Sequence, residues 1–488
     1  MPKSKHMPVR RSSVWKLGAA LTICLTASVG VRAERYAITG VSVIPMDQER
    51  VVSDQTLLVR DGKIERYGPA ATTKVPRDAK IIDGKGRYVI PGLSDMHIHF
   101  LSGRFLDGAA ESVKKAAAES VEPEVFLFIA NGVTTVRNTG GDESVVKLRD
   151  DINAGKMEGP RIFVASMPID GDPPIIPSGK NGFGTAEKAR AYVRETAAKK
   201  FDMIKVYSTL STPVFDAVVD EAHKVGLPVI GHLPMPIDFD HALTGMRSIE
   251  HLSGFDIAFT PKKVEPVMAN LYAGWAYGTE NQIRDLAGRV AKAGVWNCPT
   301  LITVDYLVSE YDRPKLRANP QARYLPPILR DDTIFNVLFE PPHRSNLAGS
   351  RSTRLAIVKA LSDAGAPLLT GSDTWALGVI AGFSIHRELL NFVEAGLTPY
   401  QALTASTSEP ARFFNRVGEF GTIVPGASAD LVLLAANPLE NIANVDRIDG
   451  VMVRGRWYPQ VELAQRLEAQ AARFAEAPAM LGAQVPKK

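Results

Sequence analysis

The sequence predicts an α/β fold: a (β/α)8 TIM barrel with a small β-sandwich domain assembled from both ends of the chain. Apolar strand-like runs alternate with helical stretches through the centre of the chain, which is the pattern of a parallel barrel. Short β-rich stretches with glycine turns occur near both ends. In addition, residue types that bind metals follow several of the central runs, where barrel enzymes carry their active sites.

The first 33 residues have the composition of a secretory signal. They contain six Lys and Arg and no acid, and an apolar stretch from Leu17 to Val31 ends in the small-x-small pattern Val31-Arg-Ala33. We expect residues 1–33 to be a signal peptide cleaved after Ala33, which makes the mature protein periplasmic or secreted. The apolar stretch is short for a membrane span, so no stable span is expected after cleavage. An uncleaved anchor is the alternative.

The charge and the cysteine content of the chain after residue 33 indicate which partners and which covalent links to expect. The 488-residue chain has a formal charge of +4, but without the leader 51 Lys and Arg stand against 53 Asp and Glu. This balance gives no case for nucleic-acid binding, and we expect a small-molecule substrate. A homo-oligomer is left open. Cys24 and Cys298 are the only cysteines, so after cleavage Cys298 stands alone, and we predict that it is a buried structural thiol.

Residues 34–90 and 418–460 are predicted to form one composite β-sandwich. The stretch from Leu57 to Arg66 is a strand–turn–strand around Asp61-Gly62, a hairpin signal. Similar strands surround Gly455 near the other end of the chain. Neither stretch is long enough for a good sheet domain alone, so we expect the two to combine.

Residues 91–417 are predicted to form the (β/α)8 barrel. Helical stretches such as 213–225 and 351–364 separate the strand-like runs, and 461–488 reads as a C-terminal helix and tail. The predicted strands end near Asp95, Val136, Val164, Val206, Gly231, Ile249, Thr300 and Thr370.

The first predicted barrel strand ends in two alternating histidines, His97 and His99. Side chains on a strand repeat with period two, so both imidazoles point to the same side. Two imidazoles on one face form a rigid platform for a divalent transition metal. Lys205, His232, His251 and Asp373 each follow another apolar run. Because the strands of a barrel end at one mouth, these six residues together predict a metal centre there.

These motifs resemble the metal-dependent amidohydrolase superfamily, and within it the imidazolonepropionase-related, Xaa-Pro dipeptidase-like group. The resemblance covers nearly all of the chain after the leader. It is carried by Val89-Ile-Pro-Gly-Leu-Ser-Asp-Met-His97-Ile-His99, Gly132-Val-Thr-Thr-Val-Arg137-Asn-Thr-Gly140-Gly141, Asp202-Met-Ile-Lys205-Val, Leu227-Pro-Val-Ile-Gly-His232, Ser248-Ile-Glu-His251, Thr370-Gly-Ser-Asp373 and Gly421-Thr-Ile-Val-Pro-Gly-Ala-Ser-Ala-Asp430.

The resemblance implies a ligand set for two divalent ions. His97, His99 and Asp373 would bind the more buried ion, and His232 and His251 the second. Lys205 would bridge both as a carbamate formed with CO2, since a free lysine with a pKa of about 10.4 is cationic and repels metals. We expect Zn, with Mn or Co as alternatives, because imidazole and carboxylate sites accept several metals.

The resemblance also implies hydrolysis of an amide bond in a small substrate such as a dipeptide or an N-acyl amino acid. A hydroxide bridging the ions would attack the carbonyl. Asp373 would take its proton and pass it to the leaving nitrogen. Two alternatives stay open. One is a mononuclear cyclic-amide hydrolase in which Lys205 is no ligand, and the other is a non-catalytic periplasmic binding protein on the same fold.

Four residues are candidates for contacting the substrate. Tyr207 is expected either to donate a hydrogen bond to substrate or oxyanion or to pack in the wall. Arg137 offers a bidentate contact to a substrate carboxylate, with an intramolecular salt bridge as the favoured alternative. His343 and Arg344 lie in a long proline-rich segment between Pro261 and Ser350 that reads as a lid or a surface excursion.

Overall fold

The computed structural model describes residues 34–101, 111–175, 182–261, 273–309, 319–330, 349–374 and 378–475. The predicted signal peptide lies outside these ranges, as do His343 and Arg344. The expectations for those residues therefore stay predictions.

Strands from both parts of the chain form one eight-stranded sheet, in the order β15-β14-β13-β5-β1-β2-β3 with β4 paired to β1. In this order β5 lies between β1 and β13 and so joins the early strands to the late ones. The strands are β1 (Arg35–Val43), β2 (Val52–Arg60), β3 (Lys63–Pro69), β4 (Lys80–Asp83), β5 (Tyr88–Pro91), β13 (Leu431–Leu434), β14 (Ile448–Val453) and β15 (Arg456–Pro459).

The sheet branches at β1. This strand pairs with β2 over its whole length, with β4 near its start and with β5 near its end. Apolar side chains from both arms of the branch, including Ile38, Leu57, Leu431 and Met452, pack into one buried cluster. The sheet thus covers its own core, as the two layers of a sandwich do.

The central strands form a closed barrel. Parallel pairing gives β6-β7-β8 and β9-β10-β11-β12, and a bridge between Ala165 and Met203 connects the two groups. Residues 368–374 complete the ring, because Leu368 bridges Asn297 and Thr374 bridges Ile98. The (β/α)8 prediction is therefore confirmed. The strands are β6 (Leu93–Ile98), β7 (Val133–Asn138), β8 (Arg161–Val164), β9 (Ile204–Val206), β10 (Val229–Gly231), β11 (Ser248–Glu250) and β12 (Trp296–Cys298).

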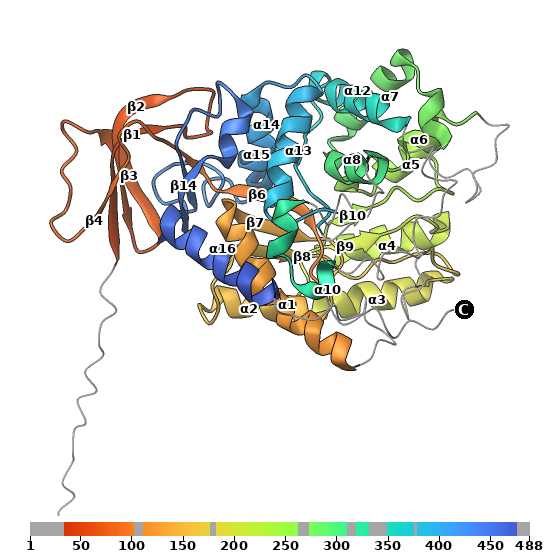
Figure 1. The fold of residues 1–488 in the computed structure, drawn as a ribbon. Coiled ribbons are helices and arrows are strands. Elements are labelled where there is room, and N and C mark those ends of the chain that lie inside the picture. Colours follow the sequence, from red (N-terminus) through yellow and green to blue (C-terminus); the bar gives the residue numbers. More distant parts are fainter. Residues whose placement is uncertain are drawn as a thin grey trace, which may run out of the picture. The chain divides into compact units, whose positions relative to one another are not determined.

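Helices lie on opposite sides of the barrel strands in Figure 1, with α12 to α14 above them and α2 and α3 below. The helices are α1 (Glu111–Ala130), α2 (Glu143–Asn153), α3 (Ala186–Ala198), α4 (Thr212–Lys224), α5 (Phe239–Leu243), α6 (Phe255–Phe259), η3 (Ala273–Tyr277), α7 (Glu280–Ala293), α8 (Leu301–Ser309), η4 (Pro320–Tyr324), α10 (Pro327–Arg330), α12 (Ser350–Asp363), α13 (Phe383–Glu394), α14 (Pro399–Ser406), α15 (Ser408–Phe413), η6 (Ile442–Asp446) and α16 (Gln460–Ala475).

Local signals explain where several helices begin and end. Thr279 and Gln282 form a capping box at the start of α7, and Gly294 ends that helix in the left-handed conformation. A second capping box opens α14. The helices predicted over 213–225 and 351–364 begin and end within one residue of α4 and α12.

Aromatic side chains fill the end of the barrel at which the strands begin. The Phe163 ring in β8 stacks on Phe414 with a centroid distance of 3.5 Å, and Trp296 at the start of β12 packs edge-on against Phe413. Phe163, Trp296 and Phe413 belong to one buried cluster inside the barrel, and Phe414 packs against it. The opposite end, where the strands finish, is therefore the end that can carry a polar site.

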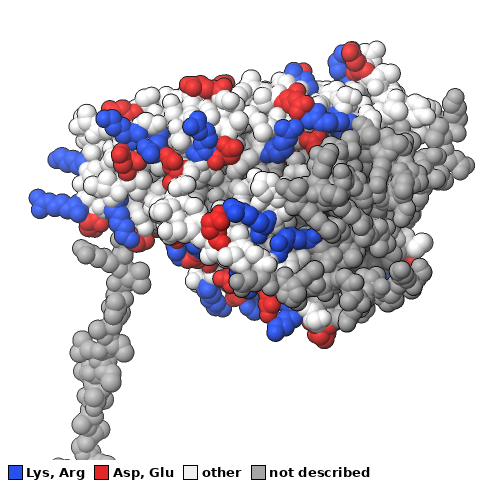
Figure 2. Space-filling model, viewed as in Figure 1, with Lys and Arg blue, Asp and Glu red and all other residues white. Residues whose placement is uncertain are grey.

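The surface drawn in Figure 2 mixes basic and acidic side chains over the described residues. Many form exposed ion pairs, such as Arg351 with Glu394, which contribute little to stability individually. Among the described residues, no helix combines the length and apolar character needed to cross a membrane.

Helix α1 contains a buried carboxyl group that predicts a pH-dependent stability. Glu124 is fully buried, and neither carboxyl oxygen has a hydrogen-bond partner among the described residues. Burial raises the pKa of Glu124 from 4.5 to about 8. Because the folded pKa lies above the unfolded one, the fold favours the protonated form, and its contribution to the free energy of unfolding declines as pH rises from 4.5 to about 8.

We therefore expect Glu124→Gln, which stays neutral, to match the parent near about pH 4.5 and to be more stable near about pH 8 by a few kcal/mol. Urea unfolding of both proteins across this range measures the difference. A stability difference that does not change with pH would contradict the assignment.

Candidate metal centre

The six predicted ligands lie at the carboxyl ends of the barrel strands. His97 is in β6 and Lys205 in β9, while His232 and His251 directly follow β10 and β11. His99 follows β6, and Asp373 lies in residues 368–374, which complete the ring. Since all barrel strands run in parallel, their ends meet at one mouth.

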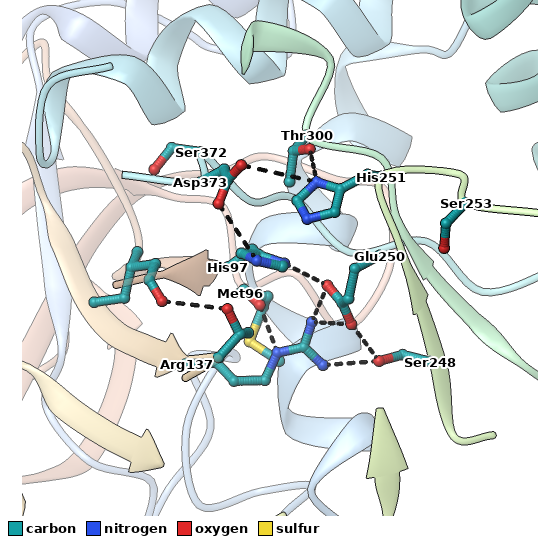
Figure 3. Close-up of polar contacts among 12 residues, drawn as sticks. Met96, His97, Arg137, Ser248, Glu250, His251, Ser253, Thr300, Ser372 and Asp373 are labelled. Carbon is teal, nitrogen blue, oxygen red and sulfur yellow. Dashed lines mark hydrogen bonds and ion pairs between the residues drawn. The ribbon is translucent and has the colours of Figure 1, made fainter. Parts of the chain in front are cut away.

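His97, His99 and Asp373 converge on a small volume (Figure 3 shows His97 and Asp373). Asp373 Oδ1 lies 3.5 Å from His97 Nε2 and 3.3 Å from His99 Nε2. One ligand atom from each of the three residues lies within 4.8 Å of the other two. This spacing is compatible with a single ion bound between them.

The other predicted ligands lie beside this group. The His251 ring centroid is 4.4 Å from that of His97 and 4.9 Å from that of His232. Lys205 is buried in the barrel interior, close enough to Asp373 and to these histidines to interact with them electrostatically. The structure thus brings all six side chains together, and their role as ligands stays a prediction.

Two glycines let the ligand-bearing segments approach their neighbours. Gly231, directly before His232, has a φ of +133°, and a Cβ there would lie 2.1 Å from the carbonyl oxygen of Val206. A Cβ on Gly371 would lie 2.5 Å from Cys298 Sγ and 2.8 Å from the Cβ of His97. A larger residue at either position would push apart the strands that carry the site.

Three contacting residues at the mouth have a left-handed backbone that non-glycine residues rarely adopt. The φ angles are +61° for His251, +47° for Thr300 and +59° for Asp373. Each such residue costs about 1–3 kcal/mol, and such strain concentrates at functional sites. Hydrogen bonds hold it: His251 N–H donates to Cys298 O at 2.9 Å, Arg354 donates to the His251 carbonyl at 2.9 Å, and Asp373 N–H donates to His97 O at 2.7 Å.

Burial sets the protonation of the site. It holds the pKa values of His97 and His232 well below the ordinary value and lowers that of His251 to about 3, so these imidazoles are neutral near pH 7. Burial acts to raise the pKa of Asp373, but His251 and His99 outweigh it, and the pKa lies below its usual value. Burial also lowers the pKa of Lys205 to about 8.

Each of three histidines is oriented by a contact at Nδ1. His232 Nδ1 lies 3.0 Å from Ser208 Oγ, His251 Nδ1 lies 2.6 Å from Thr300 Oγ1, and His97 Nδ1 lies 2.7 Å from Glu250 Oε2. Metal-binding histidines in proteins typically have such a partner on the nitrogen that faces away from the metal.

The residues present fit a divalent metal ion. His97 Nε2 is buried and has no hydrogen-bond partner among the described residues, which is costly unless another group binds it. A metal would satisfy this nitrogen. Neutral imidazoles and an ionised carboxylate are the ligands that zinc, manganese and cobalt accept.

The predicted contact of Arg137 with a substrate carboxylate is wrong. Its side chain is fully buried beneath the ligand cluster. The Nη2 atom lies 2.8 Å from both carboxylate oxygens of Glu250, Nη1 donates to Ser248 Oγ at 3.0 Å, and Nε donates to the Met96 carbonyl. These contacts engage the guanidinium within the barrel, which is the intramolecular alternative.

Tyr207 lies next to the cluster. Its ring stacks on His232 with a centroid distance of 4.0 Å, and the residue is half-buried. Its predicted substrate contact stays a prediction. Cys298 is buried, and burial raises the pKa of its thiol well above the usual value, which fits the predicted structural role.

Sequence reasoning missed Glu250 and its buried contacts with Arg137, Ser248 and His97. The signal was present: Ser248 and Glu250 alternate on a short buried strand and so share one face, as Thr135 and Arg137 do on another. A buried arginine requires a buried counter-charge. The sequence could not show that these two strands face each other across the barrel.

Comparisons with known proteins identify the family of the chain. The model of the amidohydrolase family matches residues 88–458. An imidazolonepropionase from Acidiphilium cryptum is 23% identical over 401 residues, covering 80% of this chain and 90% of that enzyme. An adenine deaminase from Moorella thermoacetica is 21% identical over 403 residues, covering 82% of this chain but only 53% of the deaminase, so the chain spans about half of that relative.

Solved structures share the fold. A Xaa-Pro dipeptidase with bound methionine superimposes with a TM-score of 0.64 at 20% identity, covering 87% of this chain and 100% of the dipeptidase. The bottromycin amidohydrolase gives a TM-score of 0.68 at 25% identity, covering 89% of this chain and 90% of that one. Because the family model spans most of the chain, the chain belongs to the amidohydrolase family, whose members are generally metal-dependent.

Proposed function

We propose that the chain is an exported metal-dependent amidohydrolase that cleaves an amide C–N bond in a small substrate, such as a dipeptide or an N-acyl amino acid. The observation that carries this proposal is the convergence of four histidines, Asp373 and Lys205 at the barrel mouth. The dipeptidase named among the structural neighbours supports a dipeptide-like substrate. Export rests on the composition of residues 1–33.

The proposed cofactor is a pair of divalent ions, with zinc expected and manganese or cobalt as alternatives. His97, His99 and Asp373 would hold one ion, and His232 and His251 the other. When bound, such ions acidify water and polarise the scissile carbonyl.

Asp373 is the proposed proton shuttle. Its side chain is 17% exposed, so it reaches both the buried ligands and the open mouth of the barrel. A pKa below the usual value keeps it ionised near pH 7, ready to accept a proton from the attacking water. The resulting acid can then protonate the leaving nitrogen.

Lys205 is the proposed bridging ligand, as a carbamate on Nζ. Carbamate formation requires the neutral amine, because the lone pair of Nζ attacks the carbon of CO2, and the nitrogen then releases one proton to solvent. The pKa of about 8 makes the neutral amine far more available near pH 7 than an ordinary lysine would. Two bound divalent ions would stabilise the resulting anion in this buried position.

The proposal predicts metal-dependent hydrolysis. We expect the zinc-loaded mature protein to hydrolyse at least one member of a panel of Xaa-Pro dipeptides and N-acyl amino acids. Chelation should abolish the turnover, and added zinc, manganese or cobalt should restore it. A coupled assay for the released amine measures the rate.

A protein that binds metal yet hydrolyses no amide, ester or carbamate in a broad panel would contradict the proposal and favour the non-catalytic alternative. Turnover of cyclic amides alone, with one metal per chain, would favour the imidazolonepropionase-like alternative. The similarity to the imidazolonepropionase from Acidiphilium cryptum supports this cyclic-amide hydrolase as the second candidate function.

A further inference from the structure

A column of buried charged groups runs through the barrel beneath the metal ligands. The Arg137 guanidinium lies 5.0 Å above the Phe413 ring, which belongs to the aromatic cluster at the closed end. Arg137 then contacts Glu250, and Glu250 contacts His97 (Figure 3). The four polar members, Arg137, Ser248, Glu250 and His97, are all fully buried.

Three polar side chains contact the carboxylate of Glu250. Arg137 Nη2 lies 2.8 Å from each oxygen, Ser248 Oγ donates to Oε1, and His97 Nδ1 lies 2.7 Å from Oε2. The guanidinium charge and the serine hydroxyl hold this carboxylate in one orientation. Its Oε2 atom is therefore a fixed acceptor beneath His97.

This arrangement determines the tautomer of His97. If the proton were on Nε2, the lone pair of Nδ1 would face a carboxylate oxygen 2.7 Å away in a buried environment, which is repulsive. With the proton on Nδ1, the same contact becomes a charge-assisted hydrogen bond. The Nε2 lone pair then points away from Glu250, on the side where Asp373 lies 3.5 Å distant.

We propose that Glu250, held by Arg137 and Ser248, is a positioning residue that fixes the proton of His97 on Nδ1 and presents Nε2 to the metal. The inference rests on the metal binding in the proposed function but not on the substrate. A buried ion pair contributes little net stability compared with apolar packing of the same volume. The Arg137–Glu250 pair is therefore better explained by its orientation of His97 than by a contribution to stability.

The same pair also ties His97 to its own strand. Arg137 Nε donates to the carbonyl of Met96, the residue directly before His97. One guanidinium therefore fixes both the backbone that carries the histidine and the carboxylate that orients its ring. Ser248, two residues before Glu250 on β11, donates to the same carboxylate and extends this support.

Glu250→Gln tests the proposal with little change in volume. The amide of glutamine has only one acceptor oxygen. If that oxygen accepts the hydrogen bond from His97, the NH2 group faces the N–H donors of Arg137, which is repulsive. If the amide reverses, His97 loses its acceptor instead. We expect zinc affinity, measured by competition with a chromophoric chelator, to fall about 10–100-fold. We also expect the visible absorption of the cobalt-loaded protein to change.

Glu124→Gln is the matched control, because Glu124 is another fully buried carboxyl group and lies on α1, outside the barrel strands. Its zinc affinity and cobalt spectrum should equal those of the parent. The comparison separates loss of a buried acid in general from loss of the acid beneath His97.

Ser248→Ala removes one donor to Glu250 and leaves both charges in place. We expect a smaller loss of zinc affinity than in Glu250→Gln, and this variant decides the question if Glu250→Gln does not fold. Folded variants that keep the parent's zinc affinity and cobalt spectrum would overturn the proposal, even if their metal-free thermal stability falls. Because these readouts need no substrate, they stand apart from a failure of the proposed hydrolysis.

Discussion

Asp373→Asn is expected to lower kcat by about 10²–10⁴-fold, the usual contribution of a positioned general acid–base. Asparagine keeps the volume and one metal-binding oxygen but cannot accept the proton of the attacking water at neutral pH. The loss should therefore fall on kcat, with KM little changed once the site is saturated with metal. Steady-state kinetics with the best substrate of the panel, at saturating zinc, measure this division.

The matched control is Asp305→Asn. The Asp305 side chain is 15% exposed, against 17% for Asp373, but it lies on α8 and pairs with Arg351 and Asn391 instead of the histidines. Its kcat should stay within about twofold of the parent. If metal-loaded Asp373→Asn turns over substrate at the parent's rate, Asp373 does not transfer the proton.

The barrel and its ligands were accessible from the sequence because their signals are local. Barrel strands buried on both faces read as short apolar runs, such as the buried Ile-Phe-Val of β8 and the buried Val-Ile of β10. The two-residue spacing of His97 and His99 is enough to predict that both side chains lie on one face of the strand. The remaining ligands each follow such a run, so the rule that strand ends meet at one mouth was enough to group them.

The contacts beneath the ligands could not be predicted from the sequence, because they join residues on strands that face each other across the barrel. Arg137 and Glu250 are 113 residues apart, and nothing in either segment names its partner. The sequence therefore predicted a substrate contact or an intramolecular salt bridge for Arg137, with the salt bridge favoured, but could not identify Glu250 as the partner. The strained backbone at Thr300 and its contact with His251 are likewise consequences of closure, since they arise where β11 and β12 end side by side.

The eighth member of the barrel shows the same limit. Residues 368–374 carry Asp373 and bridge both neighbouring strands, yet they make only isolated pairs. Asp95 holds this segment from the other side: its carboxylate accepts hydrogen bonds from the backbone N–H and hydroxyl of Ser372. An apolar run predicted the strand, but only the folded barrel shows that a buried aspartate in β6 fixes the segment bearing the proposed proton shuttle.

Lys205→Met is expected to reduce bound zinc from about two ions per chain to about one and to lower kcat by at least about 10²-fold. Methionine fills the buried volume but offers no amine to react with CO2. Loss of the bridging anion would leave His232 and His251 with too few ligands for their ion. Elemental analysis of extensively dialysed protein measures the metal content.

The CO2 requirement separates this expectation from simple damage to the barrel. Protein loaded with carbon-13 bicarbonate should show a carbamate carbon signal by NMR, and Lys205→Met should lack it. Removing CO2 before metal loading should lower the occupancy of the second metal site in the parent. It should not change the metal content of the variant. If Lys205→Met keeps the metal content and turnover of the parent, the lysine is no ligand, and the mononuclear alternative accounts for the site, because His97, His99 and Asp373 can hold one ion without it.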